Sequence, residues 1–299
     1  MVEIEEAKPS KAKVFVRRLV SASILYGILL AGLFAPNETI KLVAFGGVIS
    51  ILGALGLLEF YNLAEKRGYT PFKSFGVISG FGVILSVFWA LAIEENQSRA
   101  LDNQISFFIG SLLMLCAFHF ALPDRKERVS AILSTYAGLI YVALLLNVLQ
   151  LIRYFGGDDG SGHWWLLYFI VVSKMSDTGA YCVGSLIGKH KMVPRISPGK
   201  TWEGFAGGIV FSVLASWAFF QFGPEHFQEM KIGWALGLGV VLGVGSVLGD
   251  LIESLMKREA DVKDSGSFFP GIGGILDLLD SLLFNAPIMY LVLKYGLVA

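Results

Sequence analysis

The chain has 299 residues, of which 55% are hydrophobic and 16% are charged, and its mean hydropathy is +0.65. Soluble globular domains carry about 25% charged residues, so this composition excludes an ordinary soluble domain and predicts an integral membrane protein. Basic and acidic residues both number 24, so the net charge of zero gives no sign of a nucleic-acid partner. Cys116 and Cys182 both lie in apolar runs and are expected to be free, buried thiols.

Apolar runs long enough to cross a membrane recur along the whole chain. A spanning helix needs about 20 mainly apolar residues. This rule predicts an all-α, polytopic membrane protein with about nine transmembrane helices. The predicted spans are 19–35, 40–63, 75–93, 105–122, 129–152, 164–186, 204–222, 232–252 and 272–293.

Positive charges fall in alternate gaps between these runs. Eighteen lysines and arginines lie before the first run and after the second, fourth, sixth and eighth, whereas only four lie in the remaining gaps and after the last run. Cytoplasmic loops carry an excess of lysine and arginine, so the pattern predicts a cytoplasmic N-terminus and an extracytoplasmic C-terminus. An odd number of spans follows.

The first half of the chain carries few polar side chains at membrane depth, and we interpret it as scaffold. Glu59, which precedes Tyr61 and Asn62 at the end of the second run, is expected to lie at the membrane interface. His119 is expected to be a hydrogen-bonded structural histidine. A glycine-rich segment at 156–163 predicts a flexible loop, with a calcium site as the alternative. Close helix packing is expected at Gly46, Gly47, Gly53, Gly56, Gly76, Gly80 and Gly82.

Polar residues enter the predicted membrane region at Lys174 and Asp177, which lie three residues apart on one helical face. Their mutual neutralisation is one reason why both are tolerated there. A basic loop follows at 187–203, and such loops can present cations and backbone N–H groups to phosphate oxygens. This loop is not a Walker A motif, because Pro194 stands where that motif requires its first glycine.

The segment at 246–285 places three acidic residues, Asp250, Asp277 and Asp280, inside apolar helical runs. An ionised carboxylate in a membrane span costs at least ~2.5 kcal/mol, so such residues usually face a cavity, a partner or an ion. Asp250 shares one helical face with Glu253 and Lys257, and Asp277 shares another with Asp280 and Ser281. Two helices are therefore expected to direct carboxylates across a shared gap.

The loop that joins these two helices is rich in charge. Lys257, Arg258 and Lys263 all lie at or near its start. Clustered carboxylate oxygens suit a hard cation such as Mg2+, and neighbouring lysines and arginines suit phosphate groups. The segment therefore predicts a combined metal and phosphate site.

Both polar segments of the second half resemble the phosphatidate cytidylyltransferases, also called CDP-diacylglycerol synthases. The motifs of that family match at Asp177–Tyr181, Gly188–Lys191, Ser197–Gly204, Ser254, Lys257 and Arg258, Lys263 and Asp264, Pro270 and Gly271, Gly273 and Gly274, Leu276 and Asp277, and Asp280 and Ser281. Two positions depart from the best-known form of the signature, because Ile272 stands where histidine is common and Leu278 where arginine is common. Roles of that histidine and arginine are not carried over.

The resemblance implies transfer of CMP from CTP to phosphatidic acid, giving CDP-diacylglycerol and pyrophosphate in phospholipid biosynthesis. It implies CTP, phosphatidic acid and membrane lipids as partners, a homodimer, and no nucleic acid. It also implies Mg2+ as cofactor and leaves open whether a monovalent cation shares the site. The site is expected on the cytoplasmic side of the inner (plasma) membrane. We expect a cytoplasmic tail at 1–18, a transmembrane scaffold at 19–152 and a catalytic transmembrane region at 153–299.

Residue roles follow from the matched motifs and from the helical faces. The predicted metal ligands are Asp250, Asp277 and Asp280. The predicted catalytic residues are Asp177, Lys200, Lys257, Arg258, Lys263 and Asp264. Substrate binding is assigned to Ser197, Lys200, Thr201, Lys257, Arg258, Gly273 and Gly274, with Pro270 and Gly271 also allowing close approach of the backbone to the nucleotide.

Three alternatives stay open from the sequence. A cytidylyltransferase for another lipid phosphate, such as an ether-linked or isoprenoid one, would use the same chemistry and a different apolar groove. An ion-coupled transporter could use Lys174, Asp177, Asp250 and Asp277 as a midplane site, although the first half lacks matching intramembrane acids. A structural membrane protein would leave the many buried charges without a purpose.

Overall fold

A computed structural model of the chain describes residue 24 and residues 26–121, 128–156, 161–223, 225–227, 230–266 and 273–297. Several expectations lie outside these residues, namely the tail at 1–18, the side chain of His119, the acidic part of the 156–163 loop, and Pro270, Gly271 and Ile272. Residues 26–34, within the first expected span, are helical.

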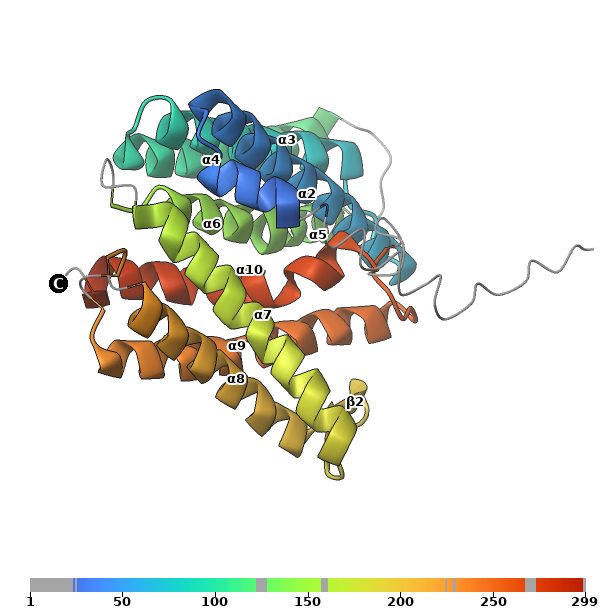
Figure 1. The fold of residues 1–299 in the computed structure, drawn as a ribbon. Helices are drawn as coiled ribbons and strands as arrows, with labels where there is room; N and C mark the ends of the chain where they lie inside the picture. Colours follow the sequence, from blue (N-terminus) through green and yellow to red (C-terminus); the bar gives the residue numbers. More distant parts are fainter. Residues whose placement is uncertain are drawn as a thin grey trace, which may run out of the picture.

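The described part of the chain is almost entirely helical (Figure 1). In chain order its elements are α2 (Glu38–Lys66), α3 (Lys73–Ala92), α4 (Gln97–Ala121), α5 (Arg128–Gly138), the π-helix η1 (Leu139–Leu144), α6 (Leu145–Arg153), α7 (Ser161–Ile187), β1 (Lys191–Val193), β2 (Ser197–Thr201), α8 (Trp202–Phe222), α9 (Ile232–Glu259), α10 (Ile275–Val292) and the π-helix η3 (Leu293–Leu297).

Seven of the described helices are long and apolar enough to cross a membrane, which supports an integral membrane protein. The run from α5 through η1 to α6 counts as one of them, and so does α10 with η3. Helix α7 coincides with the expected span at 164–186 and has 27 residues, but it is not among the seven. Its charged residues Lys174 and Asp177 make it less apolar than its neighbours.

A short antiparallel hairpin interrupts the helical architecture between α7 and α8. Strands β1 and β2 pair Lys191 with Thr201 and Val193 with Ser197. The sequence predicted a basic loop over 187–203, and the structure shows that this loop contains a hairpin. Pro194 ends the first strand, and the turn closes with a hydrogen bond from the Ile196 N–H to the Val193 carbonyl (3.2 Å). The loop residues thereby gain a fixed position relative to the helices.

The helices form two neighbouring groups, and α10 packs against both of them (Figure 1). Helices α2, α3 and α4 pack together in the first group, while α7, α8 and α9 pack together in the second. Helix α10 contacts α9 and α7 on one side and α6 and α2 on the other. The polar segments of the sequence are carried by α7, β2, α9 and α10, so the second group and α10 hold the candidate site.

Glycines allow the helices to approach closely, as the sequence predicted for the first half, except at Gly47, where an added Cβ atom would meet nothing within 4 Å. A Cβ atom added at Gly46 would collide with Phe88, and one at Gly53 would collide with Ile84. The same kind of contact joins α8 to α9, where a Cβ atom at Gly239 would lie 2.6 Å from the Cα of Val213. Because that neighbour is backbone, it cannot rotate away, so the distance between these helices depends on the missing side chain.

This contact yields a matched pair of substitutions on one helix. Gly239→Ala is expected to destabilise the fold by about 1–3 kcal/mol, because it overpacks the contact with α8. Gly237→Ala, two residues earlier, meets no atom within 4 Å and is expected to be neutral or slightly stabilising. Thermal unfolding of the purified protein in detergent micelles would measure both. Equal melting temperatures for the two variants would contradict this account of the α8–α9 contact.

Candidate functional site

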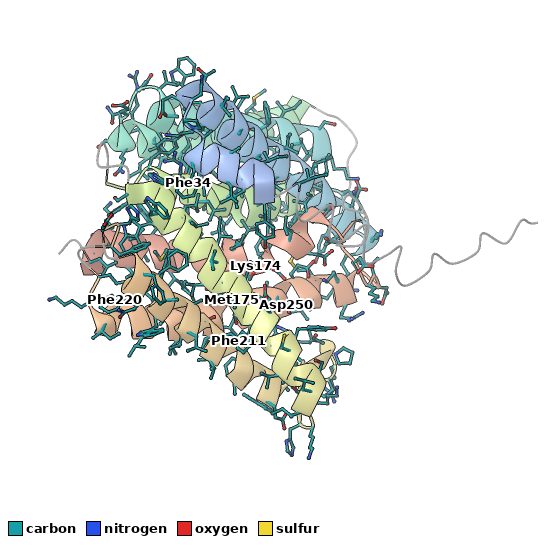
Figure 2. The ribbon with its side chains drawn as sticks, viewed as in Figure 1. Phe34, Lys174, Met175, Phe211, Phe220 and Asp250 are labelled. Atoms are coloured by element: carbon teal, nitrogen blue, oxygen red, sulfur yellow. The ribbon has the colours of Figure 1, made fainter. Side chains whose placement is uncertain are left out.

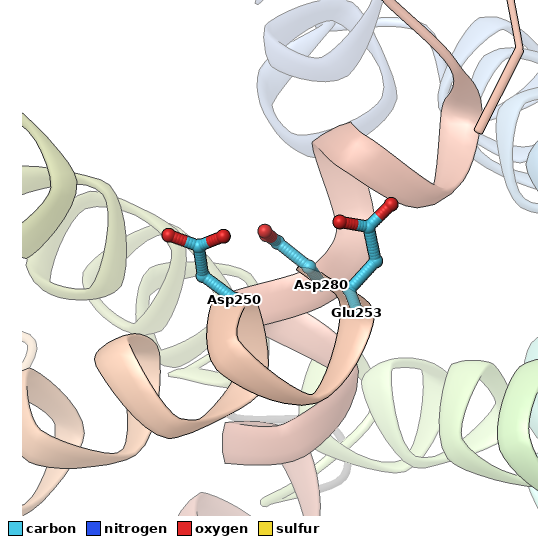
Figure 3. Close-up of side chains that lie close together, drawn as sticks. All are labelled: Asp250, Glu253 and Asp280. Carbon is cyan, nitrogen blue, oxygen red and sulfur yellow. The ribbon is translucent and has the colours of Figure 1, made fainter. Parts of the chain in front are cut away.

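Three carboxylates from two helices meet in the second half of the molecule. Asp250 and Glu253 lie one turn apart on α9, and Asp280 faces them from α10. One oxygen from each lies within 4.8 Å of the others. Figure 3 shows Asp280 between the two side chains of α9. Such a group of carboxylate oxygens suits a hard divalent cation.

A lysine from the hairpin reaches this cluster. The Nζ of Lys200, on β2, lies 2.8 Å from Oδ2 of Asp250 and donates a hydrogen bond to the Val247 carbonyl (3.0 Å). Asp250 also accepts a hydrogen bond from the Ser254 hydroxyl (3.2 Å). The hairpin therefore fixes one cation beside the cluster, as expected for a loop that binds phosphate.

A second lysine joins the cluster to the start of α10. Lys257 forms an ion pair with Glu253 one turn away on α9, and its Nζ lies 2.5 Å from Oδ1 of Asp277. Glu253 is completely buried, and within the described residues its Oε1 accepts no hydrogen bond. A buried carboxylate oxygen without a donor is costly, so this atom fits a position that faces a cation.

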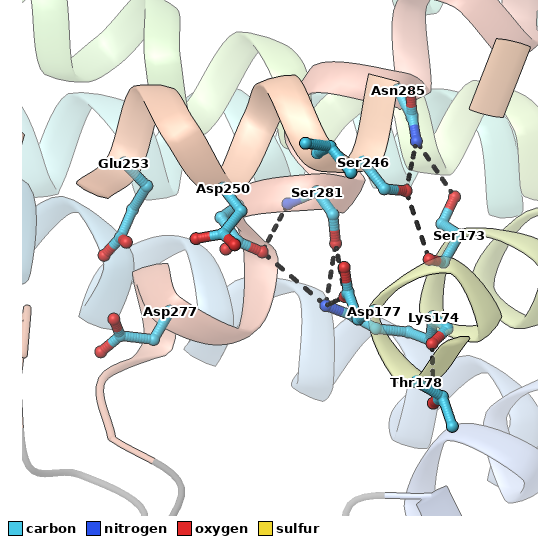
Figure 4. Close-up of polar contacts among 12 residues, drawn as sticks. Ser173, Lys174, Asp177, Thr178, Ser246, Asp250, Glu253, Asp277, Ser281 and Asn285 are labelled. Carbon is cyan, nitrogen blue, oxygen red and sulfur yellow. Dashed lines mark hydrogen bonds and ion pairs between the residues drawn. The ribbon is translucent and has the colours of Figure 1, made fainter. Parts of the chain in front are cut away.

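A third lysine approaches from α7. Lys174 lies 3.2 Å from Oδ2 of Asp177 and 3.8 Å from Oδ1 of Asp280, and it donates a hydrogen bond to the Ser281 hydroxyl (2.9 Å). The predicted ion pair within α7 is therefore confirmed, and α10 extends it (Figure 4). In Figure 2, Lys174 and Asp250 lie near each other at the middle of the molecule.

The charges of this site do not cancel. Five carboxylates, from Asp177, Asp250, Glu253, Asp277 and Asp280, face three lysines, which leaves two formal negative charges. Each carboxylate has a lysine within 4.0 Å, but carboxylates that lie close together repel one another, so the excess of negative charge is unfavourable. One divalent cation would balance the excess, so the residues present fit a metal such as Mg2+.

Asp277 is bound mainly by the loop that precedes α10. Its Oδ2 accepts hydrogen bonds from the Gly274 N–H (2.8 Å) and the Ser265 N–H (3.2 Å), and it lies 3.0 Å from the Ser265 hydroxyl. It reaches the three clustered carboxylates through Lys257. Its assignment as a metal ligand stays a prediction, whereas Glu253 joins Asp250 and Asp280 in the cluster.

Most of the chain matches known proteins of one kind. The model of the cytidylyltransferase family matches residues 16–296. The chain belongs to the cytidylyltransferase family. It is 32% identical to the phosphatidate cytidylyltransferase of Chlamydia muridarum over 93% of this chain and 92% of that protein. It is 31% identical to that of Haemophilus influenzae, over 91% and 96% of the two chains. It is 33% identical to that of Chlamydia trachomatis, over 93% and 92%.

Other residues that match the motifs of the cytidylyltransferase family hold the hairpin and its helices together. The Arg258 Nε donates a hydrogen bond to the Ile196 carbonyl in the hairpin turn (3.0 Å). Thr201 caps α8, because its hydroxyl accepts from the Gly204 N–H (3.1 Å). Glu203 accepts from the backbone N–H groups of Lys189 (3.1 Å) and His190 (3.2 Å).

The remaining predicted residues lie in the hairpin and in the loop between α9 and α10. Ser197 begins β2, and Lys263 and Asp264 are exposed in the loop after α9. Gly273 adopts φ = 116°, a conformation that favours glycine, directly before the start of α10.

A polar contact behind the site was not predicted. The Asn285 amide on α10 donates to the hydroxyl of Ser246 (2.9 Å) on α9 and to that of Ser173 (3.3 Å) on α7 (Figure 4). These three residues lie on the same helices that carry Asp280, Asp250 and Lys174. The only signal in the sequence was the presence of small polar residues in apolar runs, which is typical of helix contacts in membranes.

The acidic cluster predicts a divalent-cation site that can be measured directly. Asp280→Asn removes one of three charges, so we expect Mn2+ to bind at least about tenfold more weakly. Electron paramagnetic resonance of Mn2+ titrated into detergent-solubilised protein would measure the affinity. The matched control is Asp261→Asn, an exposed position with φ = 53° that asparagine tolerates. Equal Mn2+ affinity in both variants would place the metal elsewhere.

Proposed function

We propose that this chain transfers CMP from CTP to phosphatidic acid, giving CDP-diacylglycerol and pyrophosphate. Membership of the cytidylyltransferase family and the names of the relatives support the reaction. The location of the site is inferred from the cluster of Asp250, Glu253 and Asp280, in which each carboxylate pairs with a lysine. Carboxylates for a cation and lysines for phosphate groups are what this reaction requires.

The chemistry needs little beyond orientation and charge stabilisation. A phosphate oxygen of the lipid forms a bond to the α-phosphorus of CTP, the bond from that phosphorus to the bridging oxygen breaks, and pyrophosphate leaves with the electron pair. A phosphate monoester is already ionised near pH 7, so the attacking oxygen requires no strong general base. The side chains therefore serve to hold two anionic substrates in line and to offset their charge.

The acidic residues would hold Mg2+, with Asp250, Glu253 and Asp280 as the ligands best supported by geometry. When bound, the ion would supply positive charge to the phosphate groups of the nucleotide. Asp277, also proposed from the sequence, contributes by fixing Lys257 at 2.5 Å. Asp177 holds Lys174 at 3.2 Å in the same way.

The cations are assigned to the phosphate groups. Lys200 pairs with Asp250 and Lys257 pairs with Glu253, and both would contact the triphosphate once substrate competes for their ion pairs. Arg258 holds the hairpin turn beside them. Ser197 and Thr201 complete the hairpin side of the nucleotide site, and Lys263 and Asp264 lie in the loop that would cover it.

An apolar cleft favours approach of the lipid from the α7 side. Lys174 lines this cleft together with Leu278, Leu279 and Leu282 of α10. A lipid phosphate at Lys174 would lie near Asp280, whose Oδ1 is 3.8 Å from that lysine, and the cleft of about 70 Å³ would hold only the first part of a chain beside the leucines. Leu278, where the best-known form of the family signature has arginine, adds apolar surface to the cleft. Ether-linked or isoprenoid phosphates are the second candidate substrates, since the same cleft would hold the first part of their chains.

The reaction is tested by following pyrophosphate release from purified protein in detergent and lipid micelles with Mg2+. We expect release that requires phosphatidic acid and is strongest with CTP or dCTP among the nucleoside triphosphates. Silence with phosphatidic acid and release with an isoprenoid phosphate would favour the second candidate. If folded protein releases no pyrophosphate with any lipid phosphate, the proposal is overturned. The next measurement would then be ion flux in liposomes.

Asp277→Asn is expected to abolish pyrophosphate release while leaving expression and membrane insertion intact. The amide keeps the size of the side chain but loses the charge that holds Lys257. Asp102→Asn, at an exposed position on α4, serves as the matched control and should retain wild-type rates. Wild-type turnover in Asp277→Asn would remove this residue from the site.

The site is proposed to face the cytoplasm of the inner membrane, in a homodimer with nine spans and a cytoplasmic N-terminus. The orientation follows from the alternating basic gaps, whereas the homodimer is what the family resemblance implies. The orientation predicts opposite labelling at the two ends of α3. In protein without its native cysteines, Ser98→Cys should react with a membrane-impermeant maleimide in intact cells. Arg67→Cys should react only after permeabilisation. The reverse pattern would invert the topology.

A further inference from the structure

A carboxylate from the scaffold half reaches the loop that carries the site. Glu59 lies on α2 and is 8% exposed. Its Oε2 accepts hydrogen bonds from the Ser265 hydroxyl (3.0 Å) and from the Leu276 N–H (3.0 Å). The sequence predicted a side chain at the membrane interface; the structure adds that the carboxylate is buried against residues more than 200 positions away in the chain.

The contact with Leu276 completes the N-terminus of α10. The N-cap of this helix is Gly274, which has no side chain to accept a hydrogen bond from the first free N–H groups. Leu276 is the second residue of the helix, where a capping side chain normally accepts. Glu59 supplies that acceptor from another helix, and its negative charge lies at the favourable end of the helix dipole.

Two glycines make room for this carboxylate. A Cβ atom added at Gly266 would lie 2.0 Å from Oε1 of Glu59. A Cβ atom added at Gly274 would lie 2.5 Å from Oε2 of Glu59 and 2.1 Å from the Ser265 hydroxyl. The sequence assigned Gly274 to close approach of the nucleotide. That assignment stays a prediction; the structure shows that Gly274 also makes room for the Glu59 and Ser265 side chains and for the backbone N of Gly266.

Ser265 connects this cap to the site. Its hydroxyl lies 3.0 Å from Oε2 of Glu59 and 3.0 Å from Oδ2 of Asp277, and the side chain is buried. Asp277 in turn holds Lys257, which pairs with Glu253. A short chain of polar contacts therefore runs from α2 to the acidic cluster.

We propose that Glu59 is a positioning residue for the metal and phosphate site. By capping α10 it fixes where that helix begins, and thereby where Asp277 and, one turn later, Asp280 point. Within the described residues Glu59 forms no ion pair with a lysine or arginine, so the helix N-terminus and the Ser265 hydroxyl are its partners. The inference rests on the proposed function for its catalytic meaning, but its effect on metal binding is separate from turnover.

The test compares Glu59→Ala with Glu59→Gln and with Glu65→Ala, an exposed carboxylate on the same helix. Removal of residues that orient ligands typically costs 10–100-fold, so Glu59→Ala should lower kcat by at least about tenfold. It should also raise the Mn2+ dissociation constant by at least about fivefold, with little change in the KM for phosphatidic acid. Glu59→Gln keeps an acceptor oxygen and should restore both values to within about threefold. Glu65→Ala should match the wild type.

Several outcomes would overturn the inference. Wild-type Mn2+ affinity in Glu59→Ala, with only a lower melting temperature, would leave Glu59 a purely structural residue. Equal loss in Glu59→Gln would mean that charge, and not the position of the acceptor, is what matters. If Glu59→Ala does not fold, Ser265→Ala removes only the bridge and must weaken Mn2+ binding in the same direction. Because Mn2+ binding is measured without substrates, a failed pyrophosphate assay would reject the proposed reaction without deciding this test.

Discussion

The need to neutralise charge inside an apolar helical protein organises this structure. Carboxylates in a membrane span are costly unless each meets a cation, a donor or an ion. Lys174, Lys200 and Lys257 come from α7, β2 and α9, and each pairs with carboxylates that the other elements carry. These elements therefore meet where their charges offset one another. The site that results keeps two formal negative charges in excess, which one divalent cation would balance.

The contacts around the site fix the relative positions of α7, the hairpin, α9 and α10. Arg258 ties the end of α9 to the hairpin turn, and Asn285 joins α10 to Ser246 and Ser173 behind the carboxylates. Side chains that are oriented by such contacts lose less freedom when substrate binds. In a family whose reaction consists largely of holding two phosphate compounds in line, rigidity of this kind is the main contribution that the protein can make.

Local spacing predicted much of this from the sequence, and its failures share one cause. The helical runs, the Lys174–Asp177 pair and the facing of Asp250 and Asp280 all follow from periodicity or from composition. Glu253 was recognised as lying on the Asp250 face, but its burial and its place in the cluster depend on how α10 packs against α9. The hairpin and the capping role of Glu59 depend on contacts between distant segments, which spacing along one helix does not report.

The cap on α10 also links two positions in evolution. An amino acid with a side chain at 274 would occupy the space that the Glu59 carboxylate fills, and a chain without Glu59 would leave α10 without its acceptor. A substitution at either position alone is therefore harmful. A capping side chain at position 274 becomes acceptable only in a chain that has already lost Glu59 and in which Ser265 has moved away from position 274. Relatives that have exchanged one solution for the other should differ at both positions together.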